Sequence, residues 1–83
     1  MTEPDKKRCN SLLATLAFAG QSVARELRNE LESVHGIPCT LDRVSADLRR
    51  LADLGAVRFD PDTGVAQITN DGREHVQRLR ELF

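Results

Sequence analysis

Apolar residues recur at helical spacing in three consecutive stretches of the chain, and each stretch is followed by a glycine. Ser, Thr or Asn residues at their starts can accept hydrogen bonds from the first free N–H groups of a helix. The glycines can adopt the left-handed conformation that ends one. An extended link, residues 37–39, separates the second and third stretches, because the residue before Pro38 is pushed out of the helical region. The predicted helices begin near Cys9, Ser22 and Thr40 and end at Gly20, Gly36 and Gly55.

After the third helix the apolar spacing becomes alternating, which is typical of half-buried strands. Val57 and Phe59 alternate before residues 60–64, and Ala66 and Ile68 alternate after them. The intervening Asp-Pro-Asp-Thr-Gly combines a proline that presets the first turn position with a glycine that supplies a positive φ. The sequence therefore predicts a two-stranded hairpin.

A last helix follows the hairpin, with Thr69 or Asn70 as its cap. One face of this helix carries Gly72, His75, Val76, Leu79, Leu82 and Phe83. Residues 1–8 mix charges with a proline and predict a flexible arm. An isolated hairpin is marginal in water, so we expect it to pack on the helices. The pattern predicts a single α+β domain over residues 9–83, made of three helices, a two-stranded hairpin and a C-terminal helix, with a core of Leu16, Leu27, Leu31, Val44, Leu48, Leu51, Val57, Ile68, Val76 and Leu79.

Three helices followed by a hairpin are the layout of a winged helix-turn-helix, in which the hairpin is the wing. Residues 40–57 resemble the recognition helix and following turn of bacterial winged-helix repressors, with leucines at helical spacing and a turn ending in glycine. Residues 67–73, Gln-Ile-Thr-Asn-Asp-Gly-Arg, resemble the wing exit of the same proteins. The resemblance is closest to the PadR-like repressors, with the MarR group next, and covers about residues 11–79. It implies a DNA-binding transcriptional regulator from a bacterium or phage.

The charge of the chain weighs against DNA as a whole but is unevenly distributed. The 83 residues carry a net charge of −1, whereas domains that bind nucleic acid tend to be basic. Residues 40–58 hold four arginines and three aspartates, a sum of +1. Residues 59–72 hold three aspartates and no basic residue, a sum of −3. We therefore expect the third helix to carry any contact with DNA, beside an acidic wing.

On the third helix, the leucines and Val44 are expected to face the core and the polar residues, with Asp47 among them, to face outward. Arginine can donate two hydrogen bonds to guanine, and serine or threonine can bind bases or phosphates. The predicted DNA contacts are Thr40, Arg43, Ser45, Ala46, Arg49, Arg50 and Arg58. The alternative is a solvated face on which the helix arginines pair with Asp42, Asp47 and Asp53.

A second functional class fits the acidic wing. Winged helices also serve as protein-interaction modules, because fold alone does not fix function. In that case Asp60 and Asp62 would present a phosphate-like surface to a basic protein partner, and the chain would be an inhibitor or adaptor.

An exposed apolar surface also predicts self-association. Phe18 falls off the apolar face of the first helix, and the last helix adds further large apolar residues near its end. We expect a homodimer built by the first and last helices through Phe18, Leu79, Leu82 and Phe83.

Other chemistry finds little support in the sequence. Cys9 and Cys39 are far apart and predict reduced thiols in or beside the core rather than a zinc site, so no metal or cofactor is expected. His35 and His75 each stand alone, with His75 expected to be half-buried, and no catalytic set of Ser, His and Asp accompanies them. The chain is therefore not expected to be an enzyme. Its charged start and the absence of an apolar run of ~20 residues predict a cytoplasmic protein without membrane contact.

Overall fold

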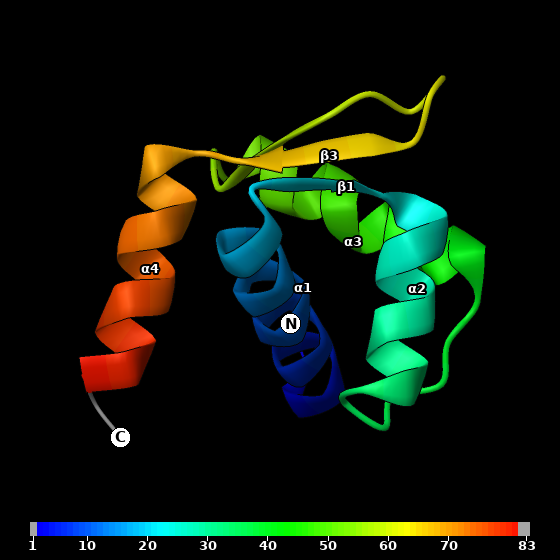
Figure 1. Ribbon diagram of the computed structural model, residues 1–83, viewed down its shortest axis with the longest axis horizontal. Coiled ribbons are helices and arrows are strands. Elements are labelled where there is room, and N and C mark those ends of the chain that lie inside the picture. The colour runs from blue at the N-terminus through cyan, green and yellow to red at the C-terminus, as the bar shows by residue number, and fades with distance from the viewer. Residues whose placement is uncertain (1, 82–83) are drawn as a thin grey trace.

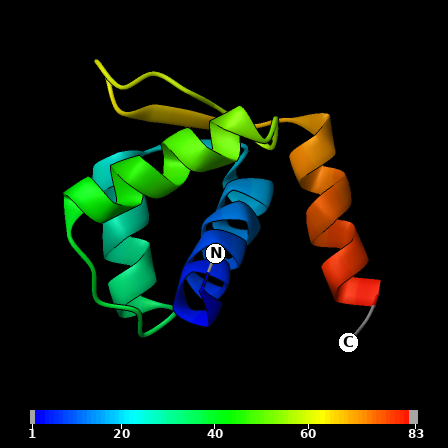
Figure 2. The same cartoon turned by 180° about the vertical axis from the view of Figure 1, so that it is seen from behind.

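The computed structural model describes residues 2–81, and the side chains of residues 2–79. A three-stranded sheet lies across one end of the helices, with α1 between α2 and α4 (Figure 1). Seen from behind, α3 crosses the molecule just below the sheet (Figure 2). The elements in chain order are α1 (Glu3–Ala19), β1 (Gln21–Val23), α2 (Ala24–Ser33), α3 (Leu41–Asp53), β2 (Val57–Phe59), β3 (Val65–Ile68) and α4 (Asn70–Glu81).

Side chains from all four helices and from the sheet meet in one core. The largest fully buried side chains come from α1, α2 and α3 and are Leu12, Leu16, Leu27, Leu31, Val44 and Leu48. Leu51, Val57, Ile68 and Val76 are also buried, so the predicted core is confirmed at these positions. Leu79 is the exception, because it is half-buried at the edge of α4. Periodicity therefore identified the apolar faces but not how far each one is covered.

The first helix begins earlier than the sequence pattern indicated. Residues 3–8, predicted as part of a flexible arm, are helical, so the predicted start near Cys9 was wrong. The side chain of Thr2 caps the helix by accepting a hydrogen bond from the backbone N–H of Asp5. Pro4 fits the first turn, where no N–H donor is needed, and acidic residues there suit the positive end of the helix dipole. This start signal consists of polar residues, which a search for apolar periodicity passes over.

A buried ion pair fixes the start of α1 against α3. The Arg8 guanidinium donates through Nε and Nη2 to the two carboxylate oxygens of Asp47, and Nη2 also reaches Asp5. The hydrogen bond to Asp47 raises the pKa of Arg8, so this side chain stays charged despite its burial. Hydrogen bonds from Thr2 and Arg8 lower the pKa of Asp5 to about 2. Two-point contact between a guanidinium and a carboxylate defines both distance and orientation, so it sets how the two helices cross.

The sheet has a third strand that the sequence analysis missed. β1 pairs antiparallel with β3, with Ser22 opposite Ala66, and β2 pairs with the other edge of β3. Ser22 therefore lies in a strand and is not the cap of α2, whose first residue follows Val23. A three-residue strand has too few positions to display alternation, so its pairing depends on the edge that β3 offers. The predicted hairpin is confirmed, and in its register Val57 is opposite Ile68 and Phe59 is opposite Ala66.

The segment after β3 joins α4 to two other elements. Thr69 caps α4 by accepting from the N–H of Gly72 at 3.1 Å, and its hydroxyl donates to the carbonyl of Gly55. A Cβ atom on Gly72 would overlap the carbonyl oxygen of Ala56, so only glycine permits this approach. Arg73 donates to the carbonyl of Ala17 at 3.0 Å, at the end of α1. Three residues of the motif at 67–73, namely Thr69, Gly72 and Arg73, therefore have structural roles.

We predict that Arg8→Ala lowers the free energy of unfolding by about 3–5 kcal/mol, because it leaves Asp47 charged and unpaired inside the protein. Lys6→Ala is the control: the Lys6–Glu3 ion pair is exposed, so its loss should cost at most about 1 kcal/mol. Joint replacement of Arg8 by Met and Asp47 by Leu should recover much of the loss. Denaturant unfolding measures all three, and equal losses for Arg8→Ala and Lys6→Ala would contradict the structural role of the buried pair.

We predict that Gly72→Ala destabilises the protein by about 1–3 kcal/mol, because the new methyl group must push Ala56 away. In an uncrowded helix the same change would stabilise by about 1 kcal/mol, so the sign of the effect is the test. Glu74→Ala, an exposed change on the same helix, should stay within about 0.5 kcal/mol of the parent protein. Thermal unfolding of the three proteins gives the comparison, and a stabilised Gly72→Ala protein would refute the close contact.

Candidate nucleic-acid interface

The outer face of α3 is the candidate interface, and local sequence explains its position. The side chain of Thr40 caps the helix by accepting from the N–H of Arg43 at 3.1 Å, as predicted. Val44, Leu48 and Leu51 turn one side of the helix into the core. The opposite side is left to solvent: Arg43, Ala46, Arg49 and Arg50 are exposed and Ser45 is half-buried.

The arginines of this face are not neutralised by neighbouring carboxylates. Among residues 2–79, the only basic side chains with a carboxylate oxygen within 4.0 Å are Lys6, Arg8 and Arg28. Asp47, predicted to face outward, is instead 2% exposed and bound to Arg8. That prediction was wrong because a partner 39 positions away supplies a counter-charge inside the fold. The exposed charge of residues 40–58 is therefore +2, from four arginines and two aspartates, rather than +1.

The predicted contacts on α3 divide between two flanks of the helix. At about 100° per residue, Ser45 and Arg49 lie one turn apart on one flank, and Arg43 and Arg50 lie on the other. Asp47, which binds Arg8 of α1, lies on the same side of α3 as Arg43 and Arg50, so this second flank is the one toward α1. Helix geometry thus divides into two groups the α3 residues that the sequence analysis treated as one set of DNA contacts.

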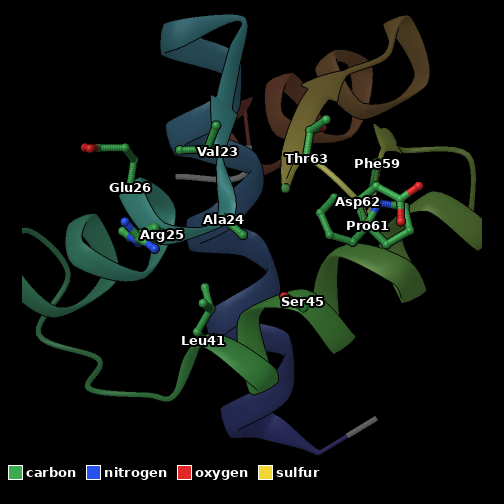
Figure 3. A pocket seen from close by; sticks show the side chains of 11 residues that line it. Val23, Ala24, Arg25, Glu26, Leu41, Ser45, Phe59, Pro61, Asp62 and Thr63 are labelled. Atoms are coloured by element: carbon green, nitrogen blue, oxygen red, sulfur yellow. The ribbon is translucent and has the colours of Figure 1, made fainter.

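A groove adjoins the Ser45 flank and was not anticipated. It has a volume of about 490 Å³ and lies between the first turn of α2, the first turn of α3 and the tip of the hairpin. Figure 3 shows Ser45 and Leu41 on α3 and Arg25 and Glu26 on α2 around this groove. The sequence analysis did not name Arg25 as a candidate. Arg25 follows β1 closely, and this strand brings the start of α2 to the edge of the groove. Because β1 was not predicted, the position of Arg25 could not be predicted either.

The hairpin is short and attached to the rest of the protein. The backbone N–H of Ala24 donates to the carbonyl of Gly64 at 2.8 Å, and Gly64 has the positive φ of 79° predicted for the turn. Asp60 accepts from the N–H of Asp62, which stabilises the turn, and both aspartates are exposed. Two negative charges therefore lie at the tip of the wing, beside the groove.

Arg58 does not join the groove. Its neighbours in β2, Val57 and Phe59, turn toward the core, so Arg58 lies on the outer face of the sheet. There it is opposite Gln67, which in turn is opposite Gln21. The structure thus holds Ser45 and Arg49 on the groove side, Arg43 and Arg50 on the far flank, and Arg58 on a separate surface.

The residues expected at a dimer interface have separate surroundings. Phe18 is 93% exposed, whereas Leu79 is half-buried beside α1. Leu82 and Phe83 lie outside the described residues. Val34, at the end of α2, was not predicted as an interface residue but is 66% exposed and shares a hollow with Phe18. Val34 follows the last residue of α2, and its side chain is not part of the core.

The cysteines and histidines lie in four different surroundings. Cys9 is buried and Cys39 half-buried, both as free thiols, as predicted. His35 contacts the hydroxyl of Thr15 at 3.2 Å, and His75, expected to be half-buried, is exposed. Among the side chains of residues 2–79, no cluster of His, Cys, Asp and Glu could hold a metal ion. No helix in the described part of the chain is long and apolar enough to cross a membrane.

Comparison with protein-family models and with curated protein sequences finds no match. Among solved structures, the chain is similar to F93 from STIV, a winged-helix DNA-binding protein of viral origin, with 19% identity, a TM-score of 0.74, and coverage of 100% of this chain and 90% of that one. It is also similar to RosR from the archaeon H. salinarum, with 24% identity, a TM-score of 0.76, and coverage of 99% and 73%. These likenesses confirm the winged helix-turn-helix fold, while the resemblance to PadR-like repressors stays a prediction.

Proposed function

We propose that this chain is a transcriptional regulator that binds double-stranded DNA through α3. The observation that carries the proposal is that the arginines of α3 are exposed and have no carboxylate partner among residues 2–79. In a winged helix this element is the one that enters the major groove. Arginines that form no ion pair within the protein can neutralise DNA phosphates, and this supplies affinity for DNA even when the protein as a whole is slightly acidic. The DNA-binding description of F93 supports the same function.

The two flanks of α3 suggest two kinds of contact. Arg49 and Ser45 lie on the flank beside the groove and are our candidates for reading base edges, with Ala46 and Thr40 close to the DNA surface. Arg43 and Arg50 lie on the far flank and are our candidates for phosphate contacts, which position the helix without reading sequence. Arg58, on the outer sheet face, is expected to contribute through long-range charge.

The wing is expected to contribute little affinity. Asp60 and Asp62 at its tip would be repelled by phosphate, and the bond between Ala24 and Gly64 keeps the tip beside α2. A regulator that reads DNA mainly with one helix gains site length by doubling, so we propose that it acts as a homodimer on two half-sites.

We predict that Arg49→Ala weakens binding to the preferred DNA by about 1–3 kcal/mol and relaxes the sequence preference, because a base contact is lost. Arg43→Ala or Arg50→Ala should weaken binding to all sequences alike and reduce the salt slope by about one unit, because a phosphate contact is lost. Titration with selected and random duplexes at several salt concentrations separates these outcomes. Arg78→Ala is the matched control, since it removes an exposed arginine from α4. If Arg49→Ala and Arg78→Ala change DNA affinity equally, the assignment of DNA binding to α3 is wrong.

We predict that Asp60→Asn combined with Asp62→Asn leaves DNA affinity unchanged or raises it, because repulsion of phosphate is removed. The same double variant also tests the second function, a protein-interaction module, which the two exposed aspartates favour. If it abolishes binding of a co-purifying basic protein, and the α3 arginine variants leave that binding intact, the protein-interaction function replaces DNA binding.

A further inference from the structure

One face of α1 carries an exposed aromatic side chain with no cover. Phe18 is 93% exposed, and with Val34 it lines a hollow of about 420 Å³ between the ends of α1 and α2. A phenylalanine so exposed costs the monomer hydrophobic free energy that a partner surface could recover. Because it touches nothing in the core, its presence is not explained by the stability of this fold.

A second hollow lies along the same helix toward its start. It has a volume of about 570 Å³, and its lining includes Lys7, Ser11 and Leu79. Ala14 and His35 line both hollows, so the two form one continuous surface over the face of α1 that lies between α4 and α2 (Figure 1). The surface thus combines a protruding aromatic ring at one end with a recess at the other.

The residues along this face have a spacing that suits helix pairing. Lys7, Ser11, Ala14 and Phe18 follow one another at intervals of four, three and four, which keeps them on one side of an α-helix. In an antiparallel crossing of two such helices centred between Ser11 and Ala14, each Phe18 meets the recess near Lys7 of the partner subunit. The side chains at the centre are small, so the two backbones can approach closely.

Charges at the two ends of the surface are also complementary. The recess also holds Lys6 and Glu3, which pair with each other, so the charges that distinguish the two ends are Glu30 beside Phe18 and Lys7 at the recess. Neither forms an ion pair with any residue whose side chain is described. The crossing described above would bring Glu30 of one subunit toward Lys7 of the other, and two-fold symmetry would form this pair twice. A surface that carries both a knob and its recess, and both signs of charge, is complementary to itself.

We propose that a second copy of this chain docks on the α1 face about a two-fold axis between Ser11 and Ala14, with each Phe18 seated in the recess of the other subunit. This inference takes up the homodimer of the proposed function and assigns its surface to α1 and the end of α2, with Leu79 at the rim. It departs from the expectation that the last helix forms much of the interface. It does not depend on DNA binding, and its test contains no DNA.

The test is a charge exchange measured by sedimentation equilibrium of the full chain. Lys7→Glu alone and Glu30→Lys alone should each weaken dimerisation by roughly tenfold, because each places two like-charged pairs in the interface. The combined variant should return to within about threefold of the parent protein, since the opposite charges face each other again. Glu74→Lys, an exposed reversal on α4, should leave the dimer unchanged and is the matched control.

Phe18→Ala gives a second measurement that is independent of charge. The side chain is outside the core, so the variant should keep the melting temperature of the monomer fold while the dimer weakens by roughly a hundredfold through loss of two buried rings. A parent protein that stays monomeric at about 100 μM, a scale chosen for weak dimers, would overturn the proposal. So would single charge reversals that add in the combined variant without restoring it. Either result leaves the DNA titrations on α3 to be judged separately.

Discussion

The arrangement of this protein depends on the buried contact between Arg8 and Asp47. It joins the second turn of α1 to the middle of α3, two helices that otherwise meet only through apolar side chains with little directional preference. Apolar contacts tolerate sliding and rotation, whereas a two-point ionic contact in a buried site does not. The orientation of α3 relative to the rest of the fold, and therefore the direction of its outer face, is fixed where these two side chains meet.

The same contact determines the electrostatics of the exposed surface. Asp47 lies among arginines in the sequence and would weaken their field if it were in solvent. Inside the fold its charge is balanced by Arg8, so the outer face of α3 keeps an excess of positive charge in a protein whose total is −1. Net charge alone weighs against a nucleic-acid surface here. A charge count becomes informative only after the buried pairs are removed from it.

Sequence reasoning recovered the parts of the fold that depend on neighbours along the chain. Helical spacing located α1, α2, α3 and α4, and the turn residues located the hairpin. Residue type identified the cap Thr40 and gave Thr69 as one of two candidates for the cap of α4. It missed β1, whose three residues become a strand only by pairing with β3, and it missed the burial of Asp47. Both depend on contacts between distant positions, which single-sequence periodicity does not encode.

In the candidate site, too, features that depend on neighbours along the chain were predicted, and features that depend on distant contacts were not. The arginines of α3 could be named from helix and charge patterns, but their separation into two flanks, and the groove beside one of them, required the orientation of the helix and the position of the hairpin tip. Arg25 entered the site only because β1 brings the start of α2 to that edge. Phe18 was correctly singled out as lying off the apolar face, since that judgement needs only the helical period.

The bond between Ala24 and Gly64 has a thermodynamic consequence. It closes the hairpin onto the helix-turn-helix, so that the wing and α2 belong to one preformed body. A surface that is already ordered loses little conformational entropy on association, and its heat-capacity change reflects only the area brought into contact, without a contribution from folding a loose segment. Calorimetry of a complex formed at the surface of the wing and α2 should therefore show the heat-capacity change of rigid docking. The size of that change should be set by the contact area alone.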